Sequence, residues 1–128
     1  MVSIVDPNNL APKELATELD KCLGLLPFEF SHEIIFLVEE HNTESNALAW
    51  NGVDYWMGKP QMAVKLFARD IDTEVKYNRI NYWLFIALHE LVHIHYRHQQ
   101  PASVLDDLEE KCNAVAHDIL QAYKQRYT

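Results

Sequence analysis

Apolar positions in the first forty residues change from a helical to an extended spacing. Residues 7–24 carry apolar side chains three and four positions apart, and Gly24 stands where a helix would end. The members of this stripe are Leu15, Leu19, Cys22 and Leu23. Residues 31–40 form instead a β-branched and aromatic run. The pattern predicts a first helix followed by a strand.

Two further segments alternate between apolar and polar positions. In residues 46–56 the alternation is centred on Asn51-Gly52, a dipeptide that favours a type I′ turn because both of its positions need positive φ. Residues 61–67 place apolar side chains on one face and a mixed set on the other, which is typical of a half-buried or edge strand. We therefore predict a hairpin at Asn51-Gly52 and then a strand over 61–67.

The second half of the chain has helical spacing almost throughout. Residues 73–98 contain no Gly or Pro and follow Asp72, a residue type suited to an N-cap. Pro101 interrupts the pattern, and residues 103–127 resume it. The apolar stripes are Ile80, Leu84, Leu88 and Leu91 in the first segment, and Val104, Leu105, Leu108, Cys112, Val115 and Ile119 in the second. These patterns predict a long helix followed by a final amphipathic helix.

The order of these elements predicts an α+β fold. An N-terminal helix precedes a small antiparallel sheet of three to four strands with a hairpin, and two helices then form an antiparallel pair. With 128 residues, three Gly and five Pro, we expect residues 1–128 to form one domain. The expected core includes Trp50, Trp56, Trp83 and Tyr123.

Composition narrows the possible partners. A formal net charge of −8 disfavours nucleic acid and anionic membrane, because binding to phosphate needs clustered Lys and Arg. No apolar run approaches the length needed to span a membrane, and no secretory signal is visible, so we expect a cytoplasmic protein. Cys22 and Cys112 are ninety positions apart at apolar helix phases, which predicts buried thiols without a disulfide.

Candidate chemistry is concentrated in residues 87–98, which hold four of the seven histidines. His89, Glu90 and His93 form an H-E-x-x-H motif. On a helix the two histidines lie one turn apart on one face, where both imidazoles can reach one zinc ion. Glu90 is rotated by about 100° from His89, so it can sit beside the metal and take a proton from a water molecule there. We predict Glu90 as a general base.

A catalytic zinc site needs a third protein ligand. In the final helix Glu109 is the one acid that falls on the apolar face, and it stands as many residues after Pro101 as His93 stands before it. The same register places Asn113 opposite His89, where it could hydrogen-bond the other ring nitrogen.

Two further histidines, His95 and His98, lie close to the motif. If the long helix ends near residue 96, His98 could replace Glu109 and give an all-histidine site. His95 points to another side of the helix and is expected at the surface or at an interface.

This set of residues resembles the gluzincin zinc metallopeptidases, in which H-E-x-x-H is completed by a Glu from a following helix. Residues 108–116 are similar to the second motif of the ImmA/IrrE-like peptidases, in which Ala-Asn follows the ligand glutamate by three and four positions. Here Cys112-Asn113 follow Glu109, and the match covers residues 85–120. The stretch "HELVHIH" is also close to SprT-like domains, in which the third ligand is His.

The resemblance implies a zincin-like fold and a zinc-dependent endopeptidase that acts on a protein or peptide, with a regulatory protein as one expected substrate. Such a substrate would lie extended along an edge strand, for which residues 61–67 are the candidate. Two alternatives stand beside this interpretation. One is a zincin-fold binding or regulatory module whose metal is structural or vestigial, without peptidase activity. The other is a helical hairpin on a small sheet, with no metal at all.

Overall fold

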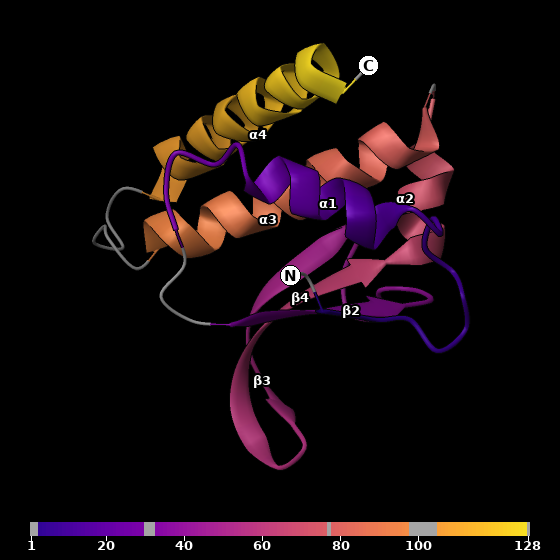
Figure 1. Ribbon diagram of the computed structural model, residues 1–128. Coiled ribbons are helices and arrows are strands. Elements are labelled where there is room, and N and C mark those ends of the chain that lie inside the picture. The colour runs from indigo at the N-terminus through magenta and orange to yellow at the C-terminus, as the bar shows by residue number, and fades with distance from the viewer. Residues whose placement is uncertain (1–2, 30–32, 77, 98–104, 128) are drawn as a thin grey trace.

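The computed structural model describes residues 3–29, 33–76, 78–97 and 105–127 (Figure 1). It contains a four-stranded sheet and four helices. Along the chain these are β1 (Ser3–Val5), α1 (Leu15–Leu23), β2 (Ile34–Glu39), β3 (Ala49–Trp56), β4 (Lys59–Phe67), α2 (Ala68–Glu74), α3 (Arg79–Arg97) and α4 (Leu105–Tyr127). The α+β class predicted from the sequence is confirmed.

The sheet is mixed, so the prediction of an antiparallel sheet is wrong. Its strand order is β1-β2-β4-β3, with β1 parallel to β2, β2 parallel to β4, and only β3 antiparallel to its neighbour. Helix α1 connects β1 to β2, and such a crossover allows the second strand to run in the same direction as the first. Strand β1 has three residues, too few to show a period in the sequence.

Strand β4 lies inside the sheet, which contradicts its prediction as an edge strand. It is flanked by β2 on one side and β3 on the other. In the part of the chain that the structure describes, the two edges are β1 and β3. An extended substrate therefore cannot pair with residues 61–67.

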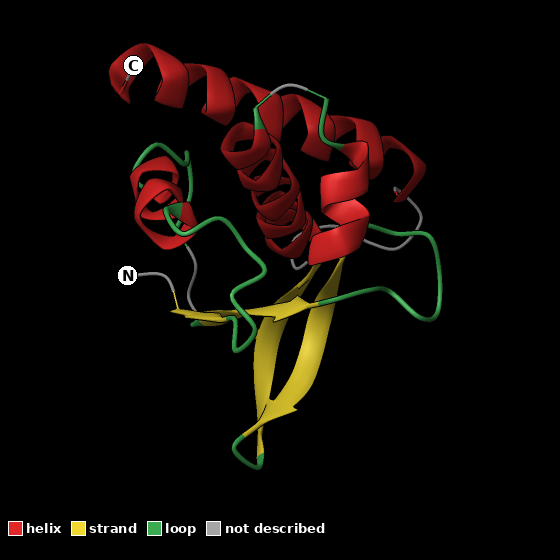
Figure 2. Cartoon of the chain, turned by 90° about the vertical axis from the view of Figure 1, so that its right-hand side faces the viewer, coloured by secondary structure: helices red, strands yellow, loops and turns green. Residues whose placement is uncertain are grey.

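The helices lie together on one side of the sheet (Figure 2). Helix α3 is central to this layer because it packs against α1, α2, α4 and the two strands of the hairpin. Helix α4 runs back across α3, as predicted for the helix pair (Figure 1). Large side chains from both layers are fully buried in one core, among them Trp83, Leu84 and Leu88 of α3, Phe36 and Leu66 of the sheet, and Leu15 and Leu19 of α1.

The hairpin turns at Met57-Gly58, six residues later than predicted. These two residues have φ values of 53° and 77°, the positive angles that a type I′ turn requires. Asn51 and Gly52 lie within β3 instead. A Cβ atom at Gly52 would stand 2.6 Å from Cζ2 of Trp50, so this glycine makes room for the indole ring beside it.

The predicted long helix is divided into α2 and α3. Helix α2 begins at Ala68, and Val75 is extended, with a ψ of 124°, before α3 begins at Arg79. Asp72 is not an N-cap. Its carboxylate accepts hydrogen bonds from Trp83 Nε1 at 2.8 Å and from Arg79, which fixes α2 against α3.

The other predicted core residues divide into two groups. Trp83 and Tyr123 are buried, and both cysteines are free and buried, as predicted. Trp50 and Trp56 are 39% and 37% exposed, so their assignment to the core is wrong. None of the described helices is long and apolar enough to cross a membrane.

Candidate metal centre

Helix α3 presents the two histidines of the motif on one face. The helix has no Gly or Pro, and the residues around the motif, Leu88, Leu91 and Val92, are at most 2% exposed. Their burial fixes the rotation of the helix. As a result the side chains of His89 and His93 are each only 11% exposed and point to the same spot, as the helical spacing predicts.

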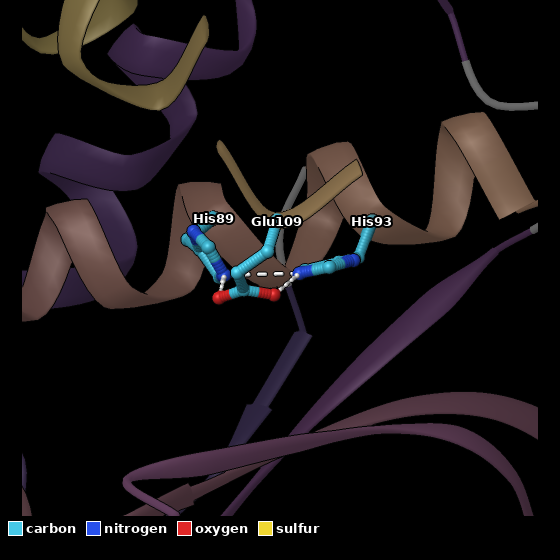
Figure 3. A group of neighbouring side chains, drawn as sticks. All are labelled: His89, His93 and Glu109. Carbon is cyan, nitrogen blue, oxygen red and sulfur yellow. Dashed lines mark hydrogen bonds and ion pairs between the residues drawn. The ribbon is translucent and has the colours of Figure 1, made fainter. Parts of the chain in front are cut away.

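Glu109 of α4 lies across from both histidines (Figure 3). One carboxylate oxygen is 2.9 Å from His89 Nε2, and the other is 2.7 Å from His93 Nε2. The two Nε2 atoms are 3.0 Å apart. The structure therefore brings together the three predicted ligands, which come from two helices.

The position of Glu109 differs from the prediction in one respect. Its side chain is 63% exposed, although the sequence placed it on the buried face of α4. That face is formed by Leu108, Cys112 and Ala116, which are at most 4% exposed. Glu109 follows Leu108 directly and lies at the border of the helix contact, where its carboxylate reaches both imidazoles from the solvent side.

The donor set fits a zinc ion. Two imidazoles and one carboxylate are the ligands of one common class of catalytic zinc site. Ligand atoms around a tetrahedral zinc ion are about 3.3 Å apart, given bonds of about 2.0–2.1 Å. The three separations here, 2.7, 2.9 and 3.0 Å, are close to that spacing. These residues could therefore hold zinc with little rearrangement.

Asn113 does not take the predicted position behind His89. Within the described part of the chain, Nδ1 of His89 is buried and has no hydrogen-bond partner, and the same holds for Nδ1 of His93. Asn113 is exposed and lines the cavity that opens beside His89 and Glu109. Asn113 thus lines the same cavity as His89, but the predicted hydrogen bond to the His89 ring is not formed.

Asn51 is the residue that the sequence did not reveal. Its amide nitrogen donates a hydrogen bond of 2.5 Å to Oε2 of Glu90, so strand β3 contacts the predicted general base directly. The prediction had used Asn51 for the hairpin turn. Once the turn is placed at Met57-Gly58, the alternation Ala49, Asn51 and Val53 puts Asn51 on the face toward α3.

A cavity of about 270 Å³ adjoins the triad. Its walls come from the segment before β3, from α3 and from α4. They include Ala47, Leu48, Ala49, Phe85, Ile86, His89, Glu90, Glu109 and Asn113. Phe85 also contacts His89, with ring centroids 6.3 Å apart. A mostly apolar cavity with a few converging polar groups is a common form of ligand site.

The two other histidines near the motif differ in outcome. His95 is partly buried and stacks on Phe28, with ring centroids 3.7 Å apart and planes 5° apart. Burial lowers the pKa of His95. Its ring packs against Phe28 and is only partly exposed, and a place at the surface or at an interface stays a prediction. His98 lies outside the described residues.

Comparison of the chain with models of protein families, with curated proteins and with solved structures finds no match. The resemblance to gluzincins and to ImmA/IrrE-like peptidases therefore stays a prediction, carried by the motif residues and their geometry.

Proposed function

We propose that this chain is a zinc-dependent endopeptidase in which His89, His93 and Glu109 hold the metal and Glu90 is the general base. The observation that carries the proposal is the convergence of three ligand atoms from α3 and α4 at one point. Glu90 stands next to that point on α3, and the cavity beside it is large enough for part of a peptide. The geometry supports a gluzincin-type site with glutamate as the third ligand.

The roles of the residues follow from their chemistry. A zinc ion at this site would polarise the carbonyl of the scissile bond and lower the pKa of a bound water molecule. Glu90 would accept the proton of the attacking water and pass it to the amine of the leaving product. Because Asn51 donates to Oε2 of Glu90, Oε1 is left to accept that proton. Asn51 is thus a positioning residue for the base.

Strand β3 is the better candidate for contact with substrate. It is an edge strand, and its residue Asn51 touches Glu90. Ala49 and the two residues before it line the cavity beside the triad. A peptide that adds to the free edge of β3 by main-chain hydrogen bonds would therefore pass the metal ligands.

The metal assignment is tested by elemental analysis of protein purified without a metal affinity step. We expect about one zinc ion per chain in the wild type and a large loss in Glu109→Ala. Glu110→Ala is the matched control, because this neighbouring acid is also exposed and does not belong to the triad. Full zinc in both variants would point to His98 as the third ligand, and a wild type that takes up no zinc would refute the proposal.

The reaction is tested by Glu90→Gln in a protein with its zinc retained. We expect cleavage of an unfolded protein such as casein to fall by about 100-fold or more, since a general base contributes about that factor. Unchanged cleavage would remove Glu90 from the mechanism. Zinc binding without cleavage of any tested protein, with partner binding unaffected by Glu90→Gln, would favour the alternative of a non-catalytic binding module.

A further inference from the structure

The hairpin formed by β3 and β4 carries an unusual share of the exposed apolar surface. Six large apolar side chains are exposed in the described part of the chain, and five of them lie within residues 50–57. They are Trp50, Val53, Tyr55, Trp56 and Met57, with Met57 87% and Tyr55 73% exposed. The end of the hairpin extends away from the helices and the rest of the sheet (Figure 1). We call residues 50–58 the hairpin arm.

The arm is nearly free of charge in an acidic chain. The protein has 19 acidic residues, but residues 45–58 contain only Asp54. Its carboxylate is 3.3 Å from Lys65 Nζ, so this charge is paired within the hairpin. Exposed apolar patches of this kind mark interaction sites, and the lack of net charge gives no attraction for nucleic acid or for a charged protein surface.

Strand β3 also has an unprotected edge. Natural proteins usually guard such edges with charged side chains, proline or a covering segment. In the described residues β3 pairs only with β4, and Asp54 is the one charged side chain between Ala49 and Gly58. The arm thus offers a row of main-chain donors and acceptors next to apolar side chains, which is the arrangement that binds an added strand.

This edge is continuous with the candidate metal centre. Asn51 contacts Glu90, and Val53 and Tyr55 follow on the same face at every second residue. At about 3.4 Å per residue, Val53 and Tyr55 lie about 7 and 14 Å along the strand from Asn51. A strand that pairs with β3 would therefore place its own side chains against these two residues and still reach the metal centre.

We propose that the hairpin arm selects the substrate by binding an uncharged, β-prone segment two to four residues to one side of the cleaved bond. This inference rests on the proposed peptidase function and names its substrate class: extended polypeptide with apolar residues at alternate positions. Continuity of the edge with the site favours a substrate strand over a second copy of this chain, because a second copy paired there would cover the cavity.

The test measures binding of a synthetic probe to the full chain by fluorescence anisotropy. The probe is a capped, labelled decapeptide of alternating valine and threonine with a lysine at each end. A second probe has the same sequence but carries N-methyl groups at every second residue, which block hydrogen bonds along one edge. We expect the first probe to bind at least about tenfold more tightly than the second, since the methyl groups remove strand pairing.

The double variant Val53→Thr/Tyr55→Thr removes apolar area from the arm and keeps residues that favour strands. We expect it to weaken binding of the first probe by about tenfold, because it removes two apolar cross-strand contacts. Tyr127→Thr is the matched control, since Tyr127 is the sixth exposed apolar side chain and lies at the end of α4. If the double variant fails to fold, Tyr55→Lys replaces it as a single exposed change.

Several outcomes would overturn the proposal. The first two are that the wild type binds both probes equally, or that the double variant binds the first probe as tightly as Tyr127→Thr does. The third is that the wild type is a dimer that only the arm variants dissociate. The fourth is that the arm binds phosphatidylcholine vesicles but not the probe.

Binding is measured with and without zinc, and in Glu90→Gln. Probe binding in a chain that takes up no zinc would end the peptidase proposal and leave the arm as a strand-binding surface without a substrate role. Zinc uptake and cleavage that the arm variants leave unchanged would end the present inference alone.

Discussion

The α3–α4 pair and the β3–β4 hairpin meet at Glu90, but they differ in how deeply their side chains are buried. In the helix pair, His89 and His93 stand on a helix whose inner face is fully buried, and this packing fixes the rotation that aims both rings at Glu109. In the hairpin, Tyr55 and Met57 are mostly exposed, and beyond the contact of Asn51 with Glu90 the strand is held mainly by β4. The comparison indicates a rigid centre for chemistry beside an open edge for recognition, with Asn51 as the direct link.

The largest expected difference between the two regions concerns their tryptophans. Trp83→Ala should lower the free energy of unfolding by about 3–5 kcal/mol, because it leaves a cavity in the core and removes a hydrogen bond to Asp72. Trp56→Ala, at a side chain that is 37% exposed, should cost less than about 1 kcal/mol. Urea unfolding followed by circular dichroism measures both. Equal losses would mean that the hairpin is as much a part of the core as α3.

Zinc binding should stabilise the protein through the helix pair, and substitutions in the hairpin arm should not change that stabilisation. At free zinc about 100 times its Kd, linkage predicts about 2.7 kcal/mol, which for a domain of this size corresponds to a rise in Tm of about 10 °C. Glu109→Ala should lose most of this rise, whereas Tyr55→Thr should keep it. Scanning calorimetry with and without zinc measures the shifts, and a rise that persists in Glu109→Ala would contradict the assigned ligand set.

The helix pair could be predicted from sequence because its information is local. Residues four apart on a continuous helix share a face, so the relation of His89 to His93 needs no knowledge of the rest of the fold. Counting from Pro101 also gave the partner of His93, because a short connection keeps two antiparallel helices in register. The helical phase did not predict the exposure of Glu109, because a residue at the border of a helix contact can be either exposed or buried.

The hairpin could not be predicted in the same way, because its information is not local. Asn51-Gly52 has the best turn chemistry in the segment, yet the strand continues through it, because Asn51 bonds to Glu90 and Gly52 accommodates Trp50. The contact of Asn51 depends on where α3 packs, and the place of the Trp50 ring depends on β4, whose Lys65 lies over it. The central position of β4 likewise depends on its pairing with β2, about 28 residues earlier, which alternation within residues 61–67 does not reveal.

Substitutions at the observed turn, Met57-Gly58, should change the free energy of unfolding by an intermediate amount. Met57 adopts a φ of 53°, which is unfavourable for a residue without a short polar side chain. Met57→Asn would create Asn-Gly at the observed turn and should stabilise the protein by about 0.5–1 kcal/mol. Gly58→Ala should destabilise it by about 1 kcal/mol, because its φ is 77°. Both are measured by urea unfolding.

Asn51→Ser provides the contrast for these turn variants. It should leave the turn intact and act on Glu90 instead, because Asn51 lies in the strand. If Met57→Asn were neutral and changes at Asn51 and Gly52 alone disturbed the hairpin, the turn would lie where the sequence first placed it.

The smallest expected effect is a pH dependence between pH 7 and pH 5 that arises from His95 in the helix layer. Burial against Phe28 lowers the pKa of His95 below its ordinary value of 6.5. Above pH 6.5 this ring is neutral in the folded and the unfolded chain, so its contribution to stability is fully present. As the pH falls below 6.5, the unfolded chain binds a proton more readily than the folded one, and stability is lost until the pH has passed the lowered pKa.

His95→Phe keeps an aromatic ring against Phe28 and removes the titration, so the difference in unfolding free energy between wild type and variant should change between pH 7 and pH 5, with the wild type losing more. Taking this difference cancels the contributions of all other titratable groups, which both proteins share. A difference that is constant across this range would show that His95 titrates alike in the folded and unfolded chains, and that the stacked ring is as open to solvent as the residues of the arm.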